Sequence, residues 1–215
     1  MKKIFLGPPG SGKGTTASRI APIYNVPHIS TGDLLRKNIQ KETDIGKKAK
    51  EQIADGGLVS DEIVMEMLKE RIFCEDCKEG FILDGFPRTI PQAEMLEKIT
   101  PIDIVINIDV PDEMIIMRNS SRISCPKCGR VYNSITMPPK EEGKCNNCNE
   151  TLVRRTDDEP NLIKKRLQVY NNQTKPLIEF YKNKGILKEI ICNSPSQTPE
   201  DICKMAMEIL EKIEK

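Results

Sequence analysis

The feature that most constrains this chain is the glycine-rich run GPPGSGKGT at residues 7–15. It follows a short apolar stretch, Lys2–Leu6, and opens a stretch with helical spacing that continues to about Tyr24, so it predicts a loop between a strand and a helix. In such a loop the backbone N–H groups turn inward around phosphate oxygens, and the helix N-terminus adds a favourable dipole. Lys13 would reach the terminal phosphates as a mobile point charge. The run therefore predicts a binding site for a nucleotide polyphosphate.

One position departs from the usual phosphate-binding loop. In that motif a serine or threonine directly follows the lysine, and its hydroxyl helps to hold Mg²⁺. Here Gly14 takes that place, and the hydroxyl comes one residue later, at Thr15. The run is therefore a degraded loop, a chance glycine-rich turn with a surface lysine, or a phosphate loop of a class that holds its metal differently. Its position between a predicted strand and a predicted helix favours the last interpretation.

The rest of the chain alternates between strand-like and helix-like segments. Its 215 residues suffice for one medium-sized domain with inserted subdomains. Residues 102–110 are almost continuously apolar, as expected for a strand buried on both faces. We expect strands at 2–6, 26–29, 80–83, 102–110 and 186–192, and helices at 11–24, 34–54 with a break at 43–44, 60–73, 92–99, 112–121, 161–184 with a kink at Pro176, and 199–215. This alternation indicates an α/β fold with a parallel sheet covered on both faces.

Four of the eight cysteines predict a metal site inside an inserted module. Residues 125–151 are rich in Cys, Pro, Gly, Asn and Lys and show little helical spacing. Within them Cys125-Pro-Lys-Cys128 is followed, after 16 residues, by Cys145-Asn-Asn-Cys148, and two such pairs form a strong signature for tetrahedral Zn²⁺. Four thiolates leave no open position for water, so the metal would be structural. Iron in a rubredoxin-like site is the alternative, because tetrahedral thiolate sites accept both ions.

The remaining C-x-x-C pair and the single histidine are assigned no catalytic role. Cys74 and Cys77 have no second pair near them in the sequence, so we interpret them as two thiols at a helix end without a function. A redox role or adventitious metal binding is the alternative for this pair. His28 is expected to be a packed or hydrogen-bonded residue at a strand end instead of a general base.

Charge and hydropathy exclude several classes of protein. The formal net charge is +1, which is unlike the basic footprint of a duplex-binding domain. No apolar run approaches the ~20 residues that span a bilayer, and the three apolar residues after Lys3 are too few for a signal peptide. We therefore expect a cytoplasmic protein with no nucleic-acid or membrane partner. A zinc ribbon for nucleic acid is the rival interpretation of the cysteine-rich insert, but the insert lacks aromatic platforms and holds several acids.

Three motifs together carry a resemblance to a known family. GPPGSGKGT at 7–15, STGDLLR at 30–36 and DGFPRT at 84–89 resemble, in this order and spacing, the adenylate kinase family in its long-lid bacterial form. The resemblance covers essentially the whole chain. It implies a P-loop NTPase-type parallel five-stranded sheet flanked by helices, with an inserted helical AMP-binding segment and a small β-rich zinc-binding lid. The implied boundaries are 1–29, 60–121 and 160–215 for the core, 30–59 for the AMP-binding segment and 122–159 for the lid.

The resemblance also implies the reaction and the donor side of the site. The expected reaction is Mg-ATP + AMP ⇌ 2 ADP, catalysed by a monomer, with Mg²⁺ accompanying ATP and structural Zn²⁺ in the lid. The expected contacts to ATP are Gly10, Ser11, Gly12, Lys13, Gly14, Thr15, Arg118, Arg122, Val131 and Tyr132. The expected catalytic residues are Lys13, Asp84, Arg88, Arg122, Arg155 and Arg166.

Individual residues on that side have alternatives. Asp84 would orient Mg²⁺ through the ion's water shell, which suits a cation that dehydrates reluctantly, whereas capping the next turn is the alternative for this acid. Arg118 and Arg122 lie four apart, and we expect them on one helical face converging on a polyanion or solvated. Family members often carry a second arginine where Ile123 stands, so one contact is expected to be missing. Asp157 and Asp158 match acids that steady the lid hinge, and a solvated acidic turn is equally compatible with them.

The acceptor side is implied in the same way. The expected contacts to AMP are Thr31, Arg36, Gly57, Leu58, Val59, Gly85, Arg88, Gln92, Arg155 and Arg166. Arg36 and Arg88 suit a bidentate grip on a monophosphate, although each could be a solvated surface arginine. The Gln92 amide can donate to and accept from the Watson–Crick edge of adenine, and Thr31 favours AMP over UMP or CMP, because relatives that use pyrimidines tend to carry a smaller residue there. A P-loop kinase for another monophosphate or a small metabolite, and an ATP-dependent nucleic-acid-binding protein, are the two alternatives.

Overall fold

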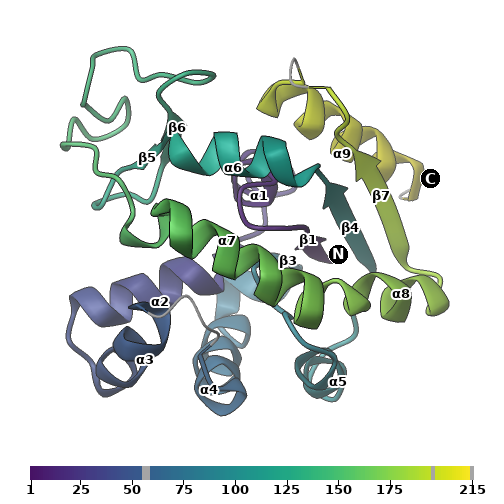
Figure 1. Cartoon of the computed structure of the whole chain (residues 1–215). Coiled ribbons are helices and arrows are strands. Elements are labelled where there is room, and N and C mark those ends of the chain that lie inside the picture. Colours follow the sequence, from purple (N-terminus) through teal and green to yellow (C-terminus); the bar gives the residue numbers. More distant parts are fainter. Residues whose placement is uncertain (55–58, 195–196, 214–215) are drawn as a thin grey trace.

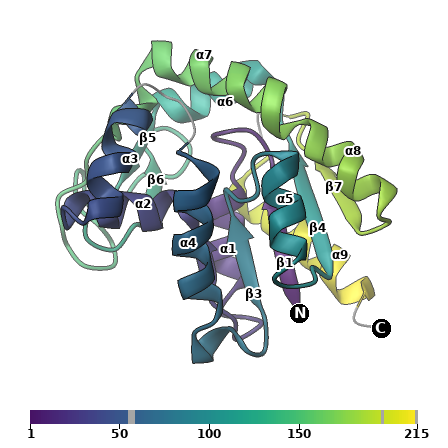
Figure 2. The same cartoon turned by 90° about the horizontal axis from the view of Figure 1, so that it is seen from below.

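A five-stranded parallel sheet forms the centre of the molecule (Figures 1 and 2). The computed structural model describes residues 1–54, 59–194 and 197–213, with residues 51–54 described by their backbone alone. The strands lie in the order β2 (His28–Ser30), β3 (Phe81–Asp84), β1 (Lys2–Leu6), β4 (Ile104–Asp109) and β7 (Leu187–Ile191). Each strand pairs in parallel with its neighbour, as in the register Ile4 with Leu83 and Ile4 with Val105. The predicted α/β fold with a parallel sheet is confirmed.

Helices cover both faces of this sheet, and each face has its own apolar core. Successive residues of β1 point to opposite faces, so Ile4 and Leu6 join one core and Phe5 joins the other. The first core packs against α4 (Asp61–Ile72), α5 (Ile90–Glu97) and α8 (Pro176–Asn183). The second packs against α1 (Lys13–Ile20), α6 (Asp112–Ser120), α7 (Pro160–Val169) and α9 (Pro199–Ile213). A sheet enclosed in this way presents only its edges and strand ends to ligands.

A helical hairpin follows β2. Helices α2 (Thr31–Gln40) and α3 (Asp44–Ala54) pack against each other, with the break that the sequence predicts before Asp44. The predicted start of this hairpin at residue 34 is wrong by three residues. The helix begins directly after Ser30, whose hydroxyl accepts a hydrogen bond from the Asp33 N–H at 3.3 Å and so caps the first turn. Thr31, the first residue of α2, therefore directly follows the last residue of β2.

The long helical stretch after residue 160 is interrupted at the place that the sequence predicts. Helix α7 passes into a π-helical turn, Tyr170–Thr174, before α8 begins with Pro176. Proline has no N–H to donate and its ring obstructs the preceding turn, so the regular hydrogen-bond ladder cannot cross it. The wider turn accommodates the proline, and the Lys175 N–H donates to the Tyr170 carbonyl.

The insert, residues 122–159, begins where the helical pattern ends. Helix α6 ends at Ser120, and β5 (Arg122–Ser124) starts two residues later and pairs antiparallel with β6 (Val131–Asn133). The hydroxyls of Ser120 and Ser121 both donate to the Met117 carbonyl, which occupies the acceptor that the next helical turn would use. The expectation that Arg118 and Arg122 share one helical face is therefore wrong. A 3₁₀ turn, Thr156–Asp158, closes the insert, and a second one, Glu75–Cys77, follows α4.

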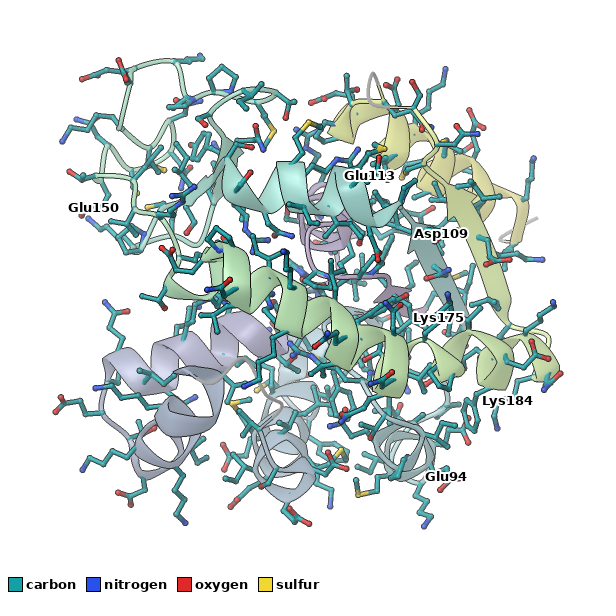
Figure 3. All side chains as sticks on the ribbon, in the orientation of Figure 1. Glu94, Asp109, Glu113, Glu150, Lys175 and Lys184 are labelled. Atoms are coloured by element: carbon teal, nitrogen blue, oxygen red, sulfur yellow. The ribbon has the colours of Figure 1, made fainter. Side chains whose placement is uncertain are left out.

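Charged side chains of both signs project from the surface (Figure 3). Glu94, Asp109 and Glu113 are exposed, as are Lys175 and Lys184. Lys184 at the end of α8 reaches Glu97 of α5 at 2.9 Å. Within the described ranges, no helix is both long and apolar enough to cross a membrane.

Candidate functional site

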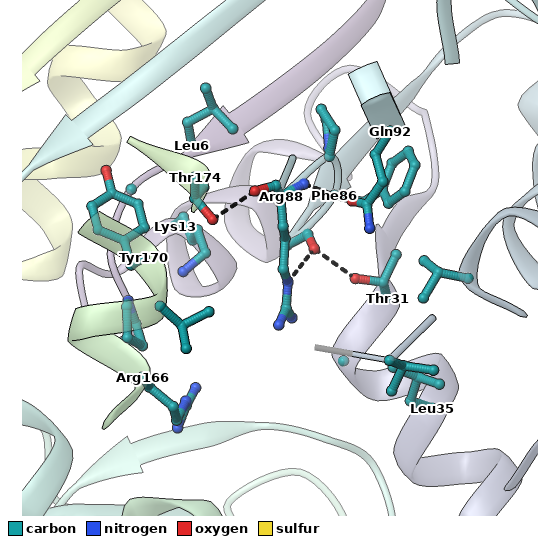
Figure 4. Close-up of a pocket in the computed structure, with 18 of the residues that line it drawn as sticks. Leu6, Lys13, Thr31, Leu35, Phe86, Arg88, Gln92, Arg166, Tyr170 and Thr174 are labelled. Atoms are coloured by element: carbon teal, nitrogen blue, oxygen red, sulfur yellow. Dashed lines mark hydrogen bonds between the residues drawn. The ribbon is translucent and has the colours of Figure 1, made fainter. Parts of the chain in front are cut away.

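The main pocket opens at the carboxyl ends of β1 and β3 (Figure 4), the edge at which parallel α/β sheets place ligands. Several segments that lie far apart in the sequence line it: the loop before α1, the start of α2, the loop after β3, and the stretch from Asp157 to Thr174. In Figure 4 the charged ends of Lys13, Arg88 and Arg166 reach into the same open region. The sequence predicted all three of these residues for one site.

The glycine-rich loop holds a shape that larger residues could not take. Gly10 has φ +88°, and a Cβ added there would collide with the side-chain amide of Asn119, which donates to the Pro9 carbonyl at 2.9 Å. Gly12 caps α1 in the left-handed region, so Lys13 is the first helical residue. Lys13 Nζ donates back to the Pro8 carbonyl at 3.1 Å.

Lys13 lies among positive charges. Its pKa is lowered to about 8, chiefly by burial; Asp84 opposes this shift, and Arg88, Arg166 and Arg122 add to it. A buried ammonium surrounded by guanidinium groups is a costly arrangement unless an anion neutralises it. The loop is therefore suited to a polyanion.

Gly14 lies directly against Asp84, the last residue of β3. A Cβ on Gly14 would come within 2.8 Å of Asp84 Oδ2, so a serine or threonine could not occupy this position unless the carboxylate moved. Burial alone would raise the pKa of Asp84, but His28, whose Nε2 is 3.5 Å from Oδ2, and Lys13 hold the pKa below its usual value. The chain departs from the usual motif at Gly14 because the Asp84 carboxylate occupies the space that a larger side chain would need. His28 is partly buried at the start of β2 beside this acid.

A network of arginines and aspartates joins the insert to the pocket. Asp158 is fully buried and accepts from Arg122, through Nε at 2.7 Å and through Nη2, and from Arg166 Nη1 at 3.3 Å. The solvated alternative for Asp158 is therefore wrong. Asp157 also accepts from Arg166, at 2.9 Å, and the surrounding arginines hold the pKa of Asp157 below its usual value against the effect of burial. Arg155 Nε donates to Ser124 Oγ at 3.3 Å.

The pKa values of these arginines record how closely they crowd. Burial lowers the pKa of Arg88 to about 10, and Arg166 and Arg36 add to the shift. Burial likewise lowers the pKa of Arg155 to about 10, with Arg36 and Arg122 as the next causes. Arg36 forms an ion pair with Asp33 at 2.5 Å on the first turn of α2. These arginines come from α2, the loop after β3, the insert and α7, so only the folded chain brings them together.

The other end of the pocket combines apolar walls with a few fixed polar groups. Thr31 Oγ1 and Arg88 Nε both donate to the Gly85 carbonyl, at 2.9 and 2.8 Å. Gln92, at 2% exposure, accepts from the Arg88 main-chain N–H at 2.7 Å. Leu35, Val59, Val64 and Phe86 supply the apolar lining. A planar, partly polar group such as a nucleobase suits this end.

The four cysteines of the insert converge as the sequence predicts. Their Sγ atoms all lie within 4.8 Å of one another, with Cys125 to Cys148 at 3.4 Å and Cys128 to Cys145 at 3.6 Å. Thiolates about 2.3 Å from one zinc ion in a tetrahedral arrangement are roughly 3.8 Å apart. The spacing of these sulfurs therefore fits a structural zinc ion.

Several predicted residues lie elsewhere than the centre of the pocket. Arg118 donates to the Ser11 and Gln197 carbonyls, both at 3.4 Å, and so braces the glycine-rich loop from outside. Tyr132 turns its side chain into the insert, where its hydroxyl lies 3.4 Å from Cys145 Sγ and accepts from the Asn146 N–H. Val131 precedes it in β6. Gly57 and Leu58 lie outside the described residues.

Other lining residues carry no signal in the sequence. Tyr170 and Thr174 come from the π-helical turn, and Thr174 Oγ1 donates to the Arg88 carbonyl at 2.9 Å. Nothing in their spacing indicates a role, because the turn that places them at the pocket depends on Pro176. Cys77, in contrast, accepts from Arg71 away from the pocket, and burial raises the pKa of its thiol. This environment fits the interpretation of Cys77 as an unreactive thiol.

Comparison with known proteins places the chain in a family. The sequence model of the family described as adenylate kinase matches residues 5–186. Adenylate kinase of Caldicellulosiruptor saccharolyticus is 53% identical over 192 residues, which cover 87% of this chain and 89% of that protein. Adenylate kinase of Archaeoglobus fulgidus is 47% identical over 218 residues, covering 99% of both chains. Adenylate kinase of Thermodesulfovibrio yellowstonii is 46% identical over 217 residues, covering 99% of this chain and all of that protein.

Proposed function

The chain belongs to the adenylate kinase family, and on that premise we propose how its own residues divide the work of the reaction. The enzyme transfers a phosphoryl group reversibly between adenine nucleotides, ATP and AMP on one side and two ADP on the other. Adenylate kinases use Mg²⁺ with ATP. The observation that carries the assignment of roles is the convergence of Lys13, Arg88 and Arg166 on one pocket.

The glycine-rich loop holds the donor. Main-chain N–H groups from Gly10 to Thr15 surround the phosphates of ATP, and Lys13 places its charge on the terminal ones. Asp84 would hold Mg²⁺, and its ionised state, maintained by His28 and Lys13, suits this task. When bound with ATP, the ion neutralises charge on the phosphate oxygens.

The loop after β3 and the start of α2 hold the acceptor. Arg36 and Arg88 bind the phosphate of AMP, and Arg88 is fixed for this by its hydrogen bond to the Gly85 carbonyl. Thr31, Val59 and Gln92 surround the adenine ring, with Gly57 and Leu58 proposed as main-chain contacts.

The transfer itself needs charge stabilisation and alignment. A phosphate oxygen of AMP is already ionised at neutral pH, so no general base is required, and His28 has no part in proton transfer. Arg122, Arg155 and Arg166 stabilise the charge that spreads over the transferred group. The pair Asp157 and Asp158 fixes Arg122 and Arg166 in position through their ion pairs.

We divide the molecule according to these tasks. Residues 1–29, 60–121 and 160–215 form the core that binds ATP phosphates, residues 30–59 form the AMP-binding segment, and the insert at 122–159 acts as a lid. Closure of the lid excludes water that would otherwise hydrolyse ATP. Zinc held by the four cysteines stiffens the lid, since a module of this size buries too little apolar surface to fold alone.

We also propose that the enzyme works as a monomer in the cytoplasm. Every group assigned to the site comes from one chain, so no partner is needed to complete it. None of the eight cysteines forms a disulfide bond, as expected in a reducing compartment. Light scattering during gel filtration tests the first statement, and fractionation of cells tests the second.

The assignment of the acceptor pocket is tested by measuring ADP formation from ATP with AMP, GMP, CMP and UMP in turn. A strong preference for AMP is expected, and a preference for CMP would overturn the roles given to Thr31 and Gln92. ATP hydrolysis measured with RNA or DNA in place of a monophosphate tests the nucleic-acid alternative. Stimulation by nucleic acid without stimulation by AMP would support that alternative.

A further inference from the structure

The buried Gln92 side chain in the acceptor pocket is held between a hydrogen-bond donor on one side and a hydrogen-bond acceptor on the other. The Arg88 main-chain N–H donates to Gln92 Oε1 at 2.7 Å, and Gln92 Nε2 donates to Asp61 Oδ1 at 2.6 Å. Asp61 is the first residue of α4, 31 positions before Gln92 in the sequence. The first of these bonds is drawn in Figure 4 beside Phe86.

These two neighbours allow only one orientation of the carboxamide. A main-chain N–H can only donate, and an ionised carboxylate can only accept. If the amide turned over, its NH₂ group would face the Arg88 N–H and its oxygen would face the Asp61 carboxylate. Both hydrogen bonds would then be replaced by repulsive contacts, which are costly for a side chain that is only 2% exposed.

The orientation determines what Gln92 can offer to a base. A carboxamide has two N–H donors and two acceptor lone pairs on its oxygen, and each neighbour uses one of them. One donor and one acceptor remain, in a fixed order. The 6-amino group and N1 of adenine present a donor and an acceptor, which match that order. The 6-oxo group and N1–H of hypoxanthine or guanine present an acceptor and a donor, which match only the reversed amide.

We propose that Asp61 is a positioning residue which, together with the Arg88 main-chain N–H, fixes the Gln92 amide so that the acceptor pocket accepts 6-aminopurine monophosphates and rejects 6-oxopurine monophosphates. This inference rests on the proposed assignment of the pocket to AMP and adds the reason for its selectivity among purines. A pocket that hydrogen-bonds its substrate in this way discriminates strongly, since the wrong base leaves buried polar groups unpaired.

The test compares AMP with inosine monophosphate, which differs from it only at position 6 and the adjoining N1 proton. In the wild-type enzyme we expect kcat/KM for AMP to exceed that for inosine monophosphate by a factor on the order of 10³ or more. Asp61→Asn offers an amide that can itself turn over, so Gln92 gains a second orientation with a partner. We expect this variant to lower the ratio at least roughly tenfold, to raise KM for AMP, and to leave KM for ATP unchanged.

The matched control is Glu62→Gln, which removes one carboxylate charge from the next, exposed residue of the same helix. It should leave the ratio at the wild-type value. Binding of AMP and of inosine monophosphate without ATP, measured by calorimetry, separates recognition from turnover. If Asp61→Asn fails to fold, Asp61→Ala provides the second variant, with the same expected direction.

The outcomes separate this inference from the proposed function. An unchanged ratio in a folded Asp61 variant, or a wild-type enzyme that binds both nucleotides equally, would overturn the inference while phosphoryl transfer to AMP stands. If Gln92→Ala leaves KM for AMP unchanged, the assignment of the pocket itself fails, and the inference fails with it.

Discussion

At the scale of single residues, the site brings together positively charged side chains that repel one another when no anion is bound. Arg88 is one of these side chains, and it is also held in place by several hydrogen bonds. Its Nε is fixed by Gly85, its N–H by Gln92 and its carbonyl by Thr174. The sequence indicated Arg88 from its place after a strand, but those three partners could not be seen in the sequence.

Replacing Arg88 by alanine should strongly reduce the rate of phosphoryl transfer and leave the affinity for ATP nearly unchanged. We expect kcat to fall about 10²- to 10³-fold, as when a single charge-stabilising donor is removed from an active site. The dissociation constant for ATP, measured by calorimetry, should change by less than roughly threefold, since the loop at 7–15 is intact. Arg71→Ala is the control, because Arg71 pairs with Asp76 outside the pocket. Unaffected turnover in the Arg88 variant would refute its role.

The lowered pKa of Lys13 predicts a pH dependence of ATP binding. A lysine whose pKa is about 8 loses its charge as the pH rises through 8. The affinity of the free enzyme for ATP should therefore fall above pH 8, approaching roughly tenfold per pH unit. The bound triphosphate restores the proton, so calorimetry at pH 9 in two buffers should detect proton uptake. Lys13→Gln should bind weakly at every pH and take up no proton. A flat profile for the wild type up to pH 10 would contradict the prediction.

At the scale of elements, apolar spacing predicted the strands to within about two residues. A strand that is buried along most of its length, such as β4, leaves a clear signal because both of its faces must be apolar. Helix α2 was predicted three residues late, since Thr31 and Gly32 look like loop residues until Ser30 is recognised as a cap. The end of α6 was predicted to within one residue, but Arg122 was wrongly expected on its helical face, because the sequence does not show that two serines stop the helix through side-chain bonds.

The insert supplies a prediction at the same scale. Its core contains little beyond Cys125, Tyr132 and Cys145, so metal should determine whether it folds. Cys145→Ser should lower bound zinc from one equivalent to much less than one, measured by mass spectrometry of the metal. Hydrogen exchange should rise across 122–159 and stay low in β1 and β4. Cys74→Ser is the control and should retain one equivalent. One equivalent of iron instead of zinc would contradict the assigned metal, and normal protection in the Cys145 variant would contradict its structural role.

At the scale of the whole molecule, the site is formed by segments that lie far apart in the sequence. Asp158 contacts Arg122 across 36 residues, and the Gln92 amide contacts Asp61 across 31. The resemblance to a family could carry over the arginines one by one. It pointed to Asp157 and Asp158 as acids of the lid hinge but not to the arginines that they pair with, because pairing between distant residues depends on the complete fold.

The insert lies close to the AMP-binding segment. A side chain on Gly129, after the first cysteine pair, would come within 3.9 Å of Asp33 Oδ2 on α2. Arg36 of α2 is near enough to Arg155 of the insert to contribute to the lowered pKa of Arg155. Together with Arg88 and Arg166, these two arginines concentrate positive charge from four parts of the chain.

A multivalent anion should stabilise the whole enzyme for this reason. Inorganic tripolyphosphate at about 100 times its dissociation constant should add about 2.7 kcal/mol to the free energy of unfolding, or roughly 5–10 °C in Tm. The shift should shrink in 0.5 M salt, because added ions screen the attraction. Arg166→Gln should reduce the shift, and Lys184→Gln, at the surface beside Glu97, should not. An equal shift in both variants would show that the anion binds elsewhere.

The contact between Gly14 and Asp84 restricts which substitutions the two positions can accept during evolution. Because a Cβ on Gly14 would meet the carboxylate at 2.8 Å, Gly14 is not free to change while the Asp84 carboxylate keeps its position. On the role proposed for Asp84, a lineage that moved a hydroxyl to the place after Lys13 would first need to shorten or displace the acid, and would pass through a form with neither way of holding the metal. Exchange between the two ways of holding Mg²⁺ would then take two steps through that weakened intermediate. Once a lineage has the pair, selection against that intermediate should keep both residues.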